Sequence, residues 1–204
     1  MFNWGKMQTI QEVITKITPL LGAAYNIPIT SNKGKVGNFL EDLAGIPHTS
    51  NCLDCTDGEV KTVPLKKLKD GKFVFKETIA ITMLSKKELV EHDFRSSKCF
   101  KKMSRMLIIP YLRDGDTIQF TELILMDKDL FGELYNELEN DYTRIRKNYT
   151  ETGILQSKTG DLLQTRTKGA GHGTTSRAFY LRPCILKEIQ YIRTSLALAS
   201  GSLE

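Results

Sequence analysis

The sequence predicts an α/β protein in which helices flank one central mixed β-sheet. Three observations predict this class: apolar residues recur at helical spacing near both ends of the chain, strand-like runs fill its middle, and residues 129–149 form a long amphipathic pattern. At 204 residues the chain can bury one sizeable core, and no internal repeat or linker divides it. We therefore expect a single domain over residues 1–200, with residues 201–204 as an appended tail.

Four helices are expected, because apolar residues recur there every three or four positions. They cover residues 8–18, 32–44, 129–149 and a C-terminal segment that begins near residue 185. Pro19 is expected to end the first helix, since proline has no backbone N–H. In the third helix the pattern predicts that acidic residues face outward and that four apolar residues face inward, namely Leu130, Leu134, Leu138 and Ile145.

The strand candidates lie between the second and third helices and again before the last. They cover residues 53–55, 59–65, 73–84, 106–112, 117–126, 162–165 and 178–182. Asp57-Gly58 is a strong hairpin signal. We therefore expect the short strand at 53–55 to fold back beside the strand at 59–65.

Composition excludes several classes of protein. A net charge of +5 and 40% hydrophobic residues are typical of a folded protein, and this charge permits an anionic partner without requiring one. No apolar run reaches the roughly 18–20 residues of a membrane helix, so no membrane partner is expected. Four cysteines are too few for a disulfide scaffold, so we expect reduced thiols and a cytoplasmic location. The C-x-x-C at Cys52 and Cys55 leaves a zinc or redox protein as an alternative.

The segment 53–62 carries the most informative group of polar residues. Glu59 and Lys61 are two positions apart on a predicted strand and therefore share a face, and the expected hairpin brings Asp54 to the same end of the sheet. Carboxylate oxygens are ligands for Mg²⁺, and a lysine beside them can offset charge that builds up on a phosphate. An exposed hairpin with a solvated Glu–Lys pair is the alternative.

The second helix adds a third acidic residue. At 3.6 residues per turn, Gly34, Gly37 and Glu41 share a face next to the apolar stripe. The two glycines allow another backbone, of protein or nucleic acid, to approach closely. Glu41 is expected to lean toward the sheet end that carries Asp54. A plain helix–sheet contact with a solvated Glu41 stays open.

Together these residues resemble the MutH/Sau-type family of GATC-specific endonucleases. The resemblance consists of ordered blocks between about residues 32 and 182: Lys33-Gly34-x-x-Gly37-x-x-Leu40-Glu41, Asp54, Glu59-Val60-Lys61-Thr62, Lys102-x-x-Arg105, Arg166-Thr167-Lys168-Gly169 and Phe179-Tyr180-Leu181. It implies the restriction-endonuclease-like PD-(D/E)xK fold and Mg²⁺-dependent hydrolysis of double-stranded DNA at GATC.

The resemblance also implies residue roles. Asp54 and Glu59 would bind the metal ion, Lys61 would be the catalytic lysine, and Glu41 would support the metal site. The residues implied at DNA are Lys33, Lys102, Arg105, Arg166, Lys168 and Tyr180. In this chain the spacing from Asp54 to Glu59 is two residues shorter than in the family, no proline precedes Asp54, and valine replaces leucine at Val60. Asp57 is therefore a rival ligand, but Asp54 is favoured because an Asp-Gly turn uses its own aspartate.

The resemblance also separates several functions. Residues 64–72 look like the Sau-type segment, which favours a type II restriction enzyme over a mismatch-repair nicking enzyme. Tyr180 favours the repair enzyme, since it matches a tyrosine beside the adenine that can be methylated, and it predicts sensitivity to adenine methylation. The chain could form the N-terminal catalytic part of a longer enzyme, or a dimer on DNA. A DNA-binding module that no longer cuts is the alternative from another class.

Positive charge is expected to concentrate around this site. The acidic segment at about 129–141 leaves the rest of the chain more basic than its average. The basic residues expected near the site include Lys66, Lys67, Lys69 and Lys72. Such a distribution predicts salt-sensitive DNA binding.

Overall fold

The computed structural model describes residues 7–30, 32, 34–168 and 176–199. The chain divides into two compact units, one formed by residues 1–77 and 102–126 and the other by residues 78–101 and 127–204. A single catalytic domain over residues 1–200 stays a prediction. Among the described residues, no helix is long and apolar enough to cross a membrane.

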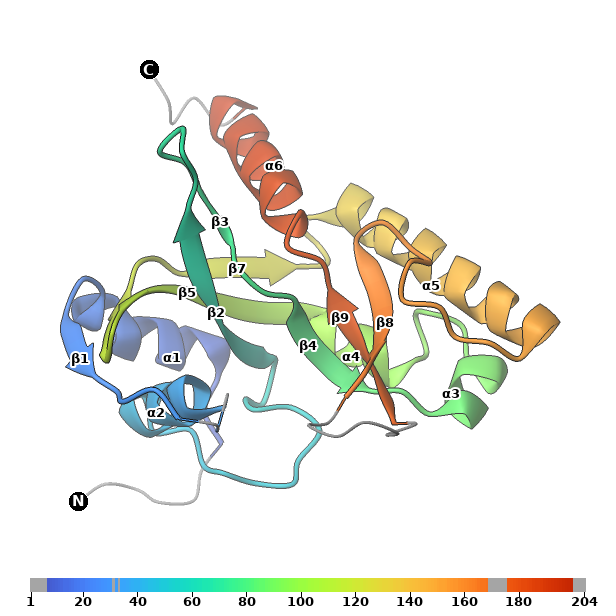
Figure 1. The fold of residues 1–204 in the computed structure, drawn as a ribbon, viewed down its shortest axis with the longest axis horizontal. Helices are drawn as coiled ribbons and strands as arrows, with labels where there is room; N and C mark the ends of the chain where they lie inside the picture. Colours follow the sequence, from blue (N-terminus) through green and yellow to red (C-terminus); the bar gives the residue numbers. More distant parts are fainter. Residues whose placement is uncertain (1–6, 31, 33, 169–175, 200–204) are drawn as a thin grey trace. The chain divides into compact units, whose positions relative to one another are not determined.

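The first unit contains the mixed sheet that the sequence predicts (Figure 1). Its strand order is β1-β6-β5-β2-β3, and β7 also pairs with β5. The strands are β1 (Ala24–Asn26), β2 (Glu59–Lys67), β3 (Phe73–Phe75), β5 (Arg105–Asp114), β6 (Thr117–Phe120) and β7 (Ile124–Asp127). The central strands β2 and β5 run parallel, with Glu59 opposite Met106, whereas β1–β6, β5–β6 and β2–β3 are antiparallel.

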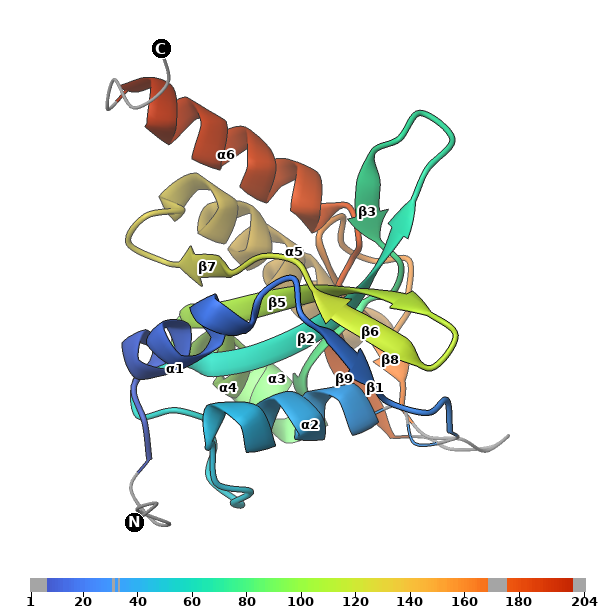
Figure 2. The same cartoon turned by 90° about the vertical axis from the view of Figure 1, so that its left-hand side faces the viewer.

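Two helices, α1 (Ile10–Ile17) and α2 (Lys35–Ala44), pack on this sheet (Figure 2). Thr9 and Glu12 form a capping box at the start of α1, each side chain accepting the other's backbone N–H. A short 3₁₀ helix over Thr18–Leu20 contains Pro19 and follows α1 directly. The apolar stripes of both helices form one core with β2, β5 and β6, which includes Ile10, Val13, Ile17, Val36, Leu40, Val60, Leu107, Ile109, Ile118 and Phe120.

The second unit contains a three-stranded antiparallel sheet in the order β4-β9-β8. Its strands are β4 (Ile79–Met83), β8 (Leu163–Thr167) and β9 (Arg177–Leu181). The remaining helices are α3 (Lys86–Glu91), α4 (Lys98–Met103), which crosses the division between the units, α5 (Gly132–Thr152) and α6 (Ile185–Ala199). Helix α5 packs against β8 and α3. Large buried side chains of this unit include Leu89, Phe94, Tyr135, Tyr142, Leu163 and Phe179.

Several sequence predictions are wrong in detail. Residues 53–55 form bends rather than a strand. The candidate at 73–84 is two strands, because β3 pairs with β2 and β4 pairs with β9 of the second unit. The candidate at 117–126 breaks after Phe120, where Thr121 donates both its backbone N–H and its hydroxyl to the carbonyl of Pro110. Leu130 is exposed, because α5 begins only at Gly132.

Candidate active site

Asp54 lies in the irregular segment between α2 and β2. Its Oδ2 atom accepts hydrogen bonds from the backbone N–H of Val60 at 3.0 Å and from Lys61 Nζ at 3.3 Å. The Cys55 N–H donates to the Gly58 carbonyl at 2.9 Å, which closes a tight turn. The predicted hairpin is therefore reduced to this turn, because the side chain of Asp54, and not a backbone ladder, binds the start of β2.

Glu59 and Lys61, the first and third residues of β2, point the same way as their spacing predicts. Lys61 Nζ lies 2.5 Å from Glu59 Oε1, and Lys102 Nζ lies 2.7 Å from the same oxygen. Only 1% of Glu59 is exposed. Its other oxygen, Oε2, is buried and has no hydrogen-bond partner in the described part of the chain.

The charges of this cluster oppose one another. Burial alone lowers the pKa of Lys61, but the Glu59 and Asp54 carboxylates raise it by more, so its net pKa lies above the ordinary lysine value. Lys61 is therefore a protonated hydrogen-bond donor at neutral pH. Buried charges of both signs persist only when they are paired, as they are here.

The orphaned Oε2 of Glu59 is the observation that tests for a metal ion. An unpaired, buried carboxylate oxygen is costly, and a divalent cation would satisfy it. No group of three or more His, Cys, Asp and Glu side chains suited to a metal ion occurs among residues 7–30, 32, 34–168 and 176–199. Mg²⁺ retains several waters and is often bound by only one or two carboxylates. Asp54 and Glu59 fit a cation of that kind.

Glu41 lies on α2, where the charges of Asp54 and Lys61 reach it. Burial chiefly raises the pKa of Glu41 and the Asp54 carboxylate raises it further, while His48 and Lys61 lower it. His48 Nδ1 lies 2.9 Å from Glu41 Oε2, and its Nε2 lies 2.9 Å from Asp42 Oδ1. The sequence did not predict a role for His48, because the contact depends on how the chain turns after α2.

Asp57 does not join this cluster. Its Oδ1 accepts the backbone N–H of Ile10 at 2.7 Å, and its Oδ2 lies 3.6 Å from Arg105 Nε. The carboxylate thus binds the positive N-terminal end of α1, where a negative charge is favourable. This placement favours Asp54 over Asp57 as the metal ligand. The partly exposed Arg105 side chain points toward Asp57.

Three of the remaining residues that were predicted to contact DNA lie in the second unit, and the fourth, Lys33, is not described. Arg166, Lys168 and Tyr180 belong to the second unit, where Arg166 is exposed and its guanidinium lies 5.9 Å from the centroid of the Tyr180 ring. Arg166 Nη1 also donates to Thr78 Oγ1 at 3.2 Å. Lys168 is exposed, and its backbone N–H donates to the Ser176 carbonyl. Residues 169–175, between these two, lie outside the described residues, and so does Lys33.

Two further expectations can be compared with the structure. Lys66, Lys67, Lys69 and Lys72 do not surround the site, because they lie at the opposite end of β2 and on the turn to β3 (Figure 1). Lys67 lies six positions along the strand from Lys61, which is about 20 Å. Cys52 and Cys55 are free thiols. Burial chiefly raises the pKa of Cys55 to about 12, so this thiol stays protonated at neutral pH, which gives no support to a redox role.

Gly58 limits what the turn before β2 can accept. A Cβ atom there would lie 2.5 Å from the Arg105 carbonyl oxygen and 2.7 Å from Ile10 Cγ1. We expect Gly58→Ala to lower the free energy of unfolding by about 2 kcal/mol. At Gly37 an added Cβ atom would make only an ordinary contact, 3.7 Å from Thr62 Oγ1. Gly37→Ala should therefore raise the free energy of unfolding by about 0.5 kcal/mol. Urea unfolding measures both, and equal stabilities would contradict this packing.

Comparison with known proteins gives one family match. Residues 49–146, just under half of the chain, match the family model described as the DNA mismatch repair enzyme MutH. The matched segment contains five predicted site residues: Asp54, Glu59, Lys61, Lys102 and Arg105. The others lie outside it: Lys33, Glu41, Arg166, Lys168 and Tyr180. No curated protein matches the chain.

Proposed function

We propose that this chain belongs to the MutH family of DNA endonucleases, which have the restriction-endonuclease-like fold, because residues 49–146 match the model of that family. It would then hydrolyse phosphodiester bonds of duplex DNA at GATC with Mg²⁺ as cofactor. One observation carries the proposal. Within the matched segment, the buried Glu59 carboxylate lies beside Asp54 and has one oxygen on two lysines, while its other oxygen has no hydrogen-bond partner among the residues that the structure describes. This is the donor set expected where a cation and a phosphate meet.

The residues of this cluster divide the work. A divalent cation held by Asp54 and Glu59 would supply positive charge at the phosphate and a water of lowered pKa. Lys61, held in place by both carboxylates, can donate to a phosphate oxygen and stabilise the charge that develops during transfer. Lys102 offers a second ammonium beside the same Glu59 oxygen.

We propose a type II restriction enzyme that cuts both strands. The Sau-like segment 64–72, which forms the end of β2 and the turn toward β3, favours this activity. Nicking in mismatch repair is the second candidate, which Tyr180 and the matched family's description favour. In either case Arg166 and Lys168 would contact guanine edges or phosphates, and Tyr180 would lie at the adenine.

A digest of unmethylated, hemimethylated and fully methylated GATC plasmids tests the proposal. We expect double-strand cuts at unmethylated GATC in Mg²⁺, slower cleavage after N6-adenine methylation, and none in EDTA. Tyr180→Ala should reduce the discrimination between methylated and unmethylated sites, whereas Tyr191→Ala, a tyrosine 72% exposed on α6, should not.

Other products of the same digest would favour other functions. Nicks confined to hemimethylated sites would favour the repair enzyme. Duplex binding without any cleavage would indicate a binding module. Mapping the fragment ends would show whether the cuts fall at GATC, and cuts at unrelated sequences would overturn the assignment of specificity.

A further inference from the structure

The end of α2 places His48 against the same helix. The Gly45 N–H donates to the Asp42 carbonyl at 3.1 Å and the Ile46 N–H donates to the Glu41 carbonyl at 2.8 Å, which is a Schellman motif with Gly45 in the left-handed region at φ 68°. Ile46 is buried behind this turn. The motif reverses the chain, and two residues later His48 lies over the Glu41 and Asp42 side chains.

Both ring nitrogens of His48 face carboxylates. Nδ1 lies 2.9 Å from Glu41 Oε2, and Nε2 lies 2.9 Å from Asp42 Oδ1. An ionised carboxylate only accepts hydrogen bonds, and a neutral imidazole carries one N–H. Both contacts are therefore hydrogen bonds at once only when the ring is an imidazolium, which donates from each nitrogen.

We propose that His48 is a positioning residue that fixes the direction of the Glu41 carboxylate near the Asp54–Lys61 cluster. Asp42, which is largely exposed, holds the outer nitrogen of the ring, and Glu41, which is partly buried, takes the inner one. The consequence for cleavage rests on the proposed function, whereas the contact itself does not.

Glu41 needs such a partner because of its surroundings. It lies within the electrostatic reach of Asp54, a like charge, and burial adds to the cost of its ionised form. Lys61 and His48 are the cations that oppose this cost. Lys61 already binds both Glu59 and Asp54, so His48 is the cation whose hydrogen bond fixes the direction of the Glu41 side chain.

The contact can be tested without activity. In the full chain labelled with ¹⁵N-histidine, NMR should show both His48 nitrogens staying protonated to a higher pH than in an ordinary histidine, because its pKa is raised, chiefly by the hydrogen bond to Asp42. Glu41→Gln and Asp42→Asn should each lower this pKa, and the signals of His92, an exposed histidine that directly follows α3, serve as the control and should not change. A His48 that titrates normally and ignores Glu41→Gln would overturn the proposal.

The catalytic consequence has a separate readout. His48→Ala should lower kcat about tenfold, as for other residues that orient a metal site, and should leave KM for a GATC duplex and the melting temperature nearly unchanged. His48→Arg, which keeps the charge and the paired donors, should restore most of kcat, and His92→Ala should match wild type. An unchanged kcat in His48→Ala, or a rise in KM alone, would contradict positioning. A wild-type protein that cuts no DNA would refute the proposed function, while the NMR result would still decide the contact.

Discussion

Lys61→Ala and Glu59→Gln are each expected to lower the rate of GATC cleavage at least about 10³-fold while the protein still binds the duplex. Lys61 is the buried ammonium that both carboxylates hold, so its loss removes the donor that would stabilise a developing phosphate charge. Glu59 provides the orphaned oxygen that fits a cation, and glutamine cannot supply that negative charge. Single-turnover cleavage with Mg²⁺, alongside duplex binding in Ca²⁺, measures both effects.

The matched control lies on the same strand. Lys66→Ala removes a lysine from the far end of β2 and should leave the cleavage rate within about twofold of wild type, because surface charges separated by more than a Debye length are screened. A loss in Lys66→Ala as large as that in Lys61→Ala would mean that bulk charge, not the cluster, supports cleavage. Full activity in Glu59→Gln would remove Glu59 from the site.

The free energy of unfolding should show that Lys61 and Lys102 do not act as independent surface charges. Each holds the same Glu59 oxygen, so either single alanine variant leaves Glu59 with one ammonium. The double variant, Lys61→Ala with Lys102→Ala, leaves the buried Glu59 carboxylate without a lysine partner, which costs about 3 kcal/mol or more. We therefore expect the double variant to lose more free energy of unfolding than the sum of the single losses.

The sequence predicted the parts of this cluster that local geometry decides. Strand alternation alone placed Glu59 and Lys61 on one face, since side-chain direction along a strand has a fixed period. The approach of Asp54 had to be inferred from a hairpin that does not form, and a side-chain contact with the N–H of Val60 provides it instead. Lys102 lies 43 residues from Glu59, and only the family resemblance indicated it.

The two-unit arrangement could not be derived from periodicity. Residues 73–84 are strand-like on both sides of the polar residues 76–78, and β3 pairs within the first unit whereas β4 pairs within the second. Alternation reports that a segment is half-buried, not which partner strand it meets. The four long helices were predictable because each carries a continuous apolar stripe, whereas the six-residue helices α3 and α4 are too short to show one.

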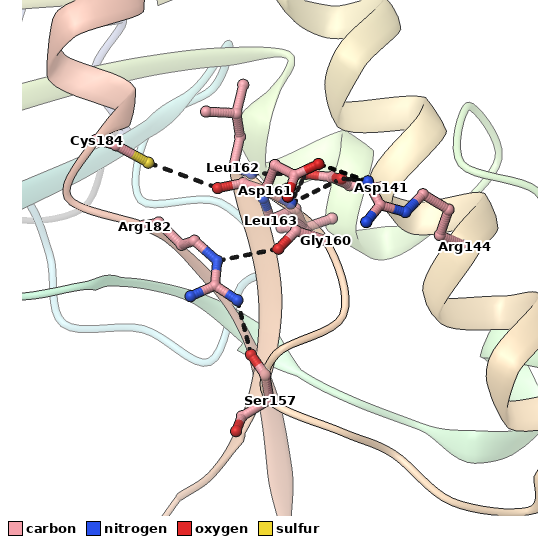
Figure 3. Close-up of polar contacts among 9 residues, drawn as sticks. All are labelled: Asp141, Arg144, Ser157, Gly160, Asp161, Leu162, Leu163, Arg182 and Cys184. Carbon is pink, nitrogen blue, oxygen red and sulfur yellow. Dashed lines mark hydrogen bonds and ion pairs between the residues drawn. The ribbon is translucent and has the colours of Figure 1, made fainter.

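Asp141 shows a different limit of periodicity. The pattern of α5 predicts that its acidic residues face solvent, but Asp141 is only 3% exposed. It points from α5 at the turn before β8, where it accepts the backbone N–H groups of Asp161, Leu162 and Leu163 at 2.7–2.9 Å (Figure 3). A helical wheel cannot reveal such a contact, because the donors are backbone groups of a distant turn.

The turn that Asp141 binds is also constrained by its own backbone. Gly160 has φ 85°, and a Cβ atom there would collide with the Leu163 carbonyl. Arg182, just after β9, donates to the carbonyls of Gly160 at 3.1 Å and Ser157 at 2.8 Å (Figure 3). The entry to β8, the strand that carries Arg166, is therefore held from both sides by charged side chains.

Asp141→Asn should consequently lower the free energy of unfolding by about 3 kcal/mol. Oδ2 accepts all three backbone N–H groups, and an asparagine oxygen in its place would be neutral, so these hydrogen bonds lose the assistance of the charge. The amide nitrogen would then replace Oδ1 and face the Asp161 N–H and the Arg144 guanidinium, which are donors as well. Arg144→Ala is the matched control: Arg144 contacts Asp141 and Asp161 but is half-exposed, so its loss should cost at most about 1 kcal/mol. Urea unfolding gives both values, and amide hydrogen exchange at residues 161–163 should accelerate in Asp141→Asn alone. Equal losses in the two variants would show that an ion pair, rather than the backbone contacts of Asp141, orders the start of β8.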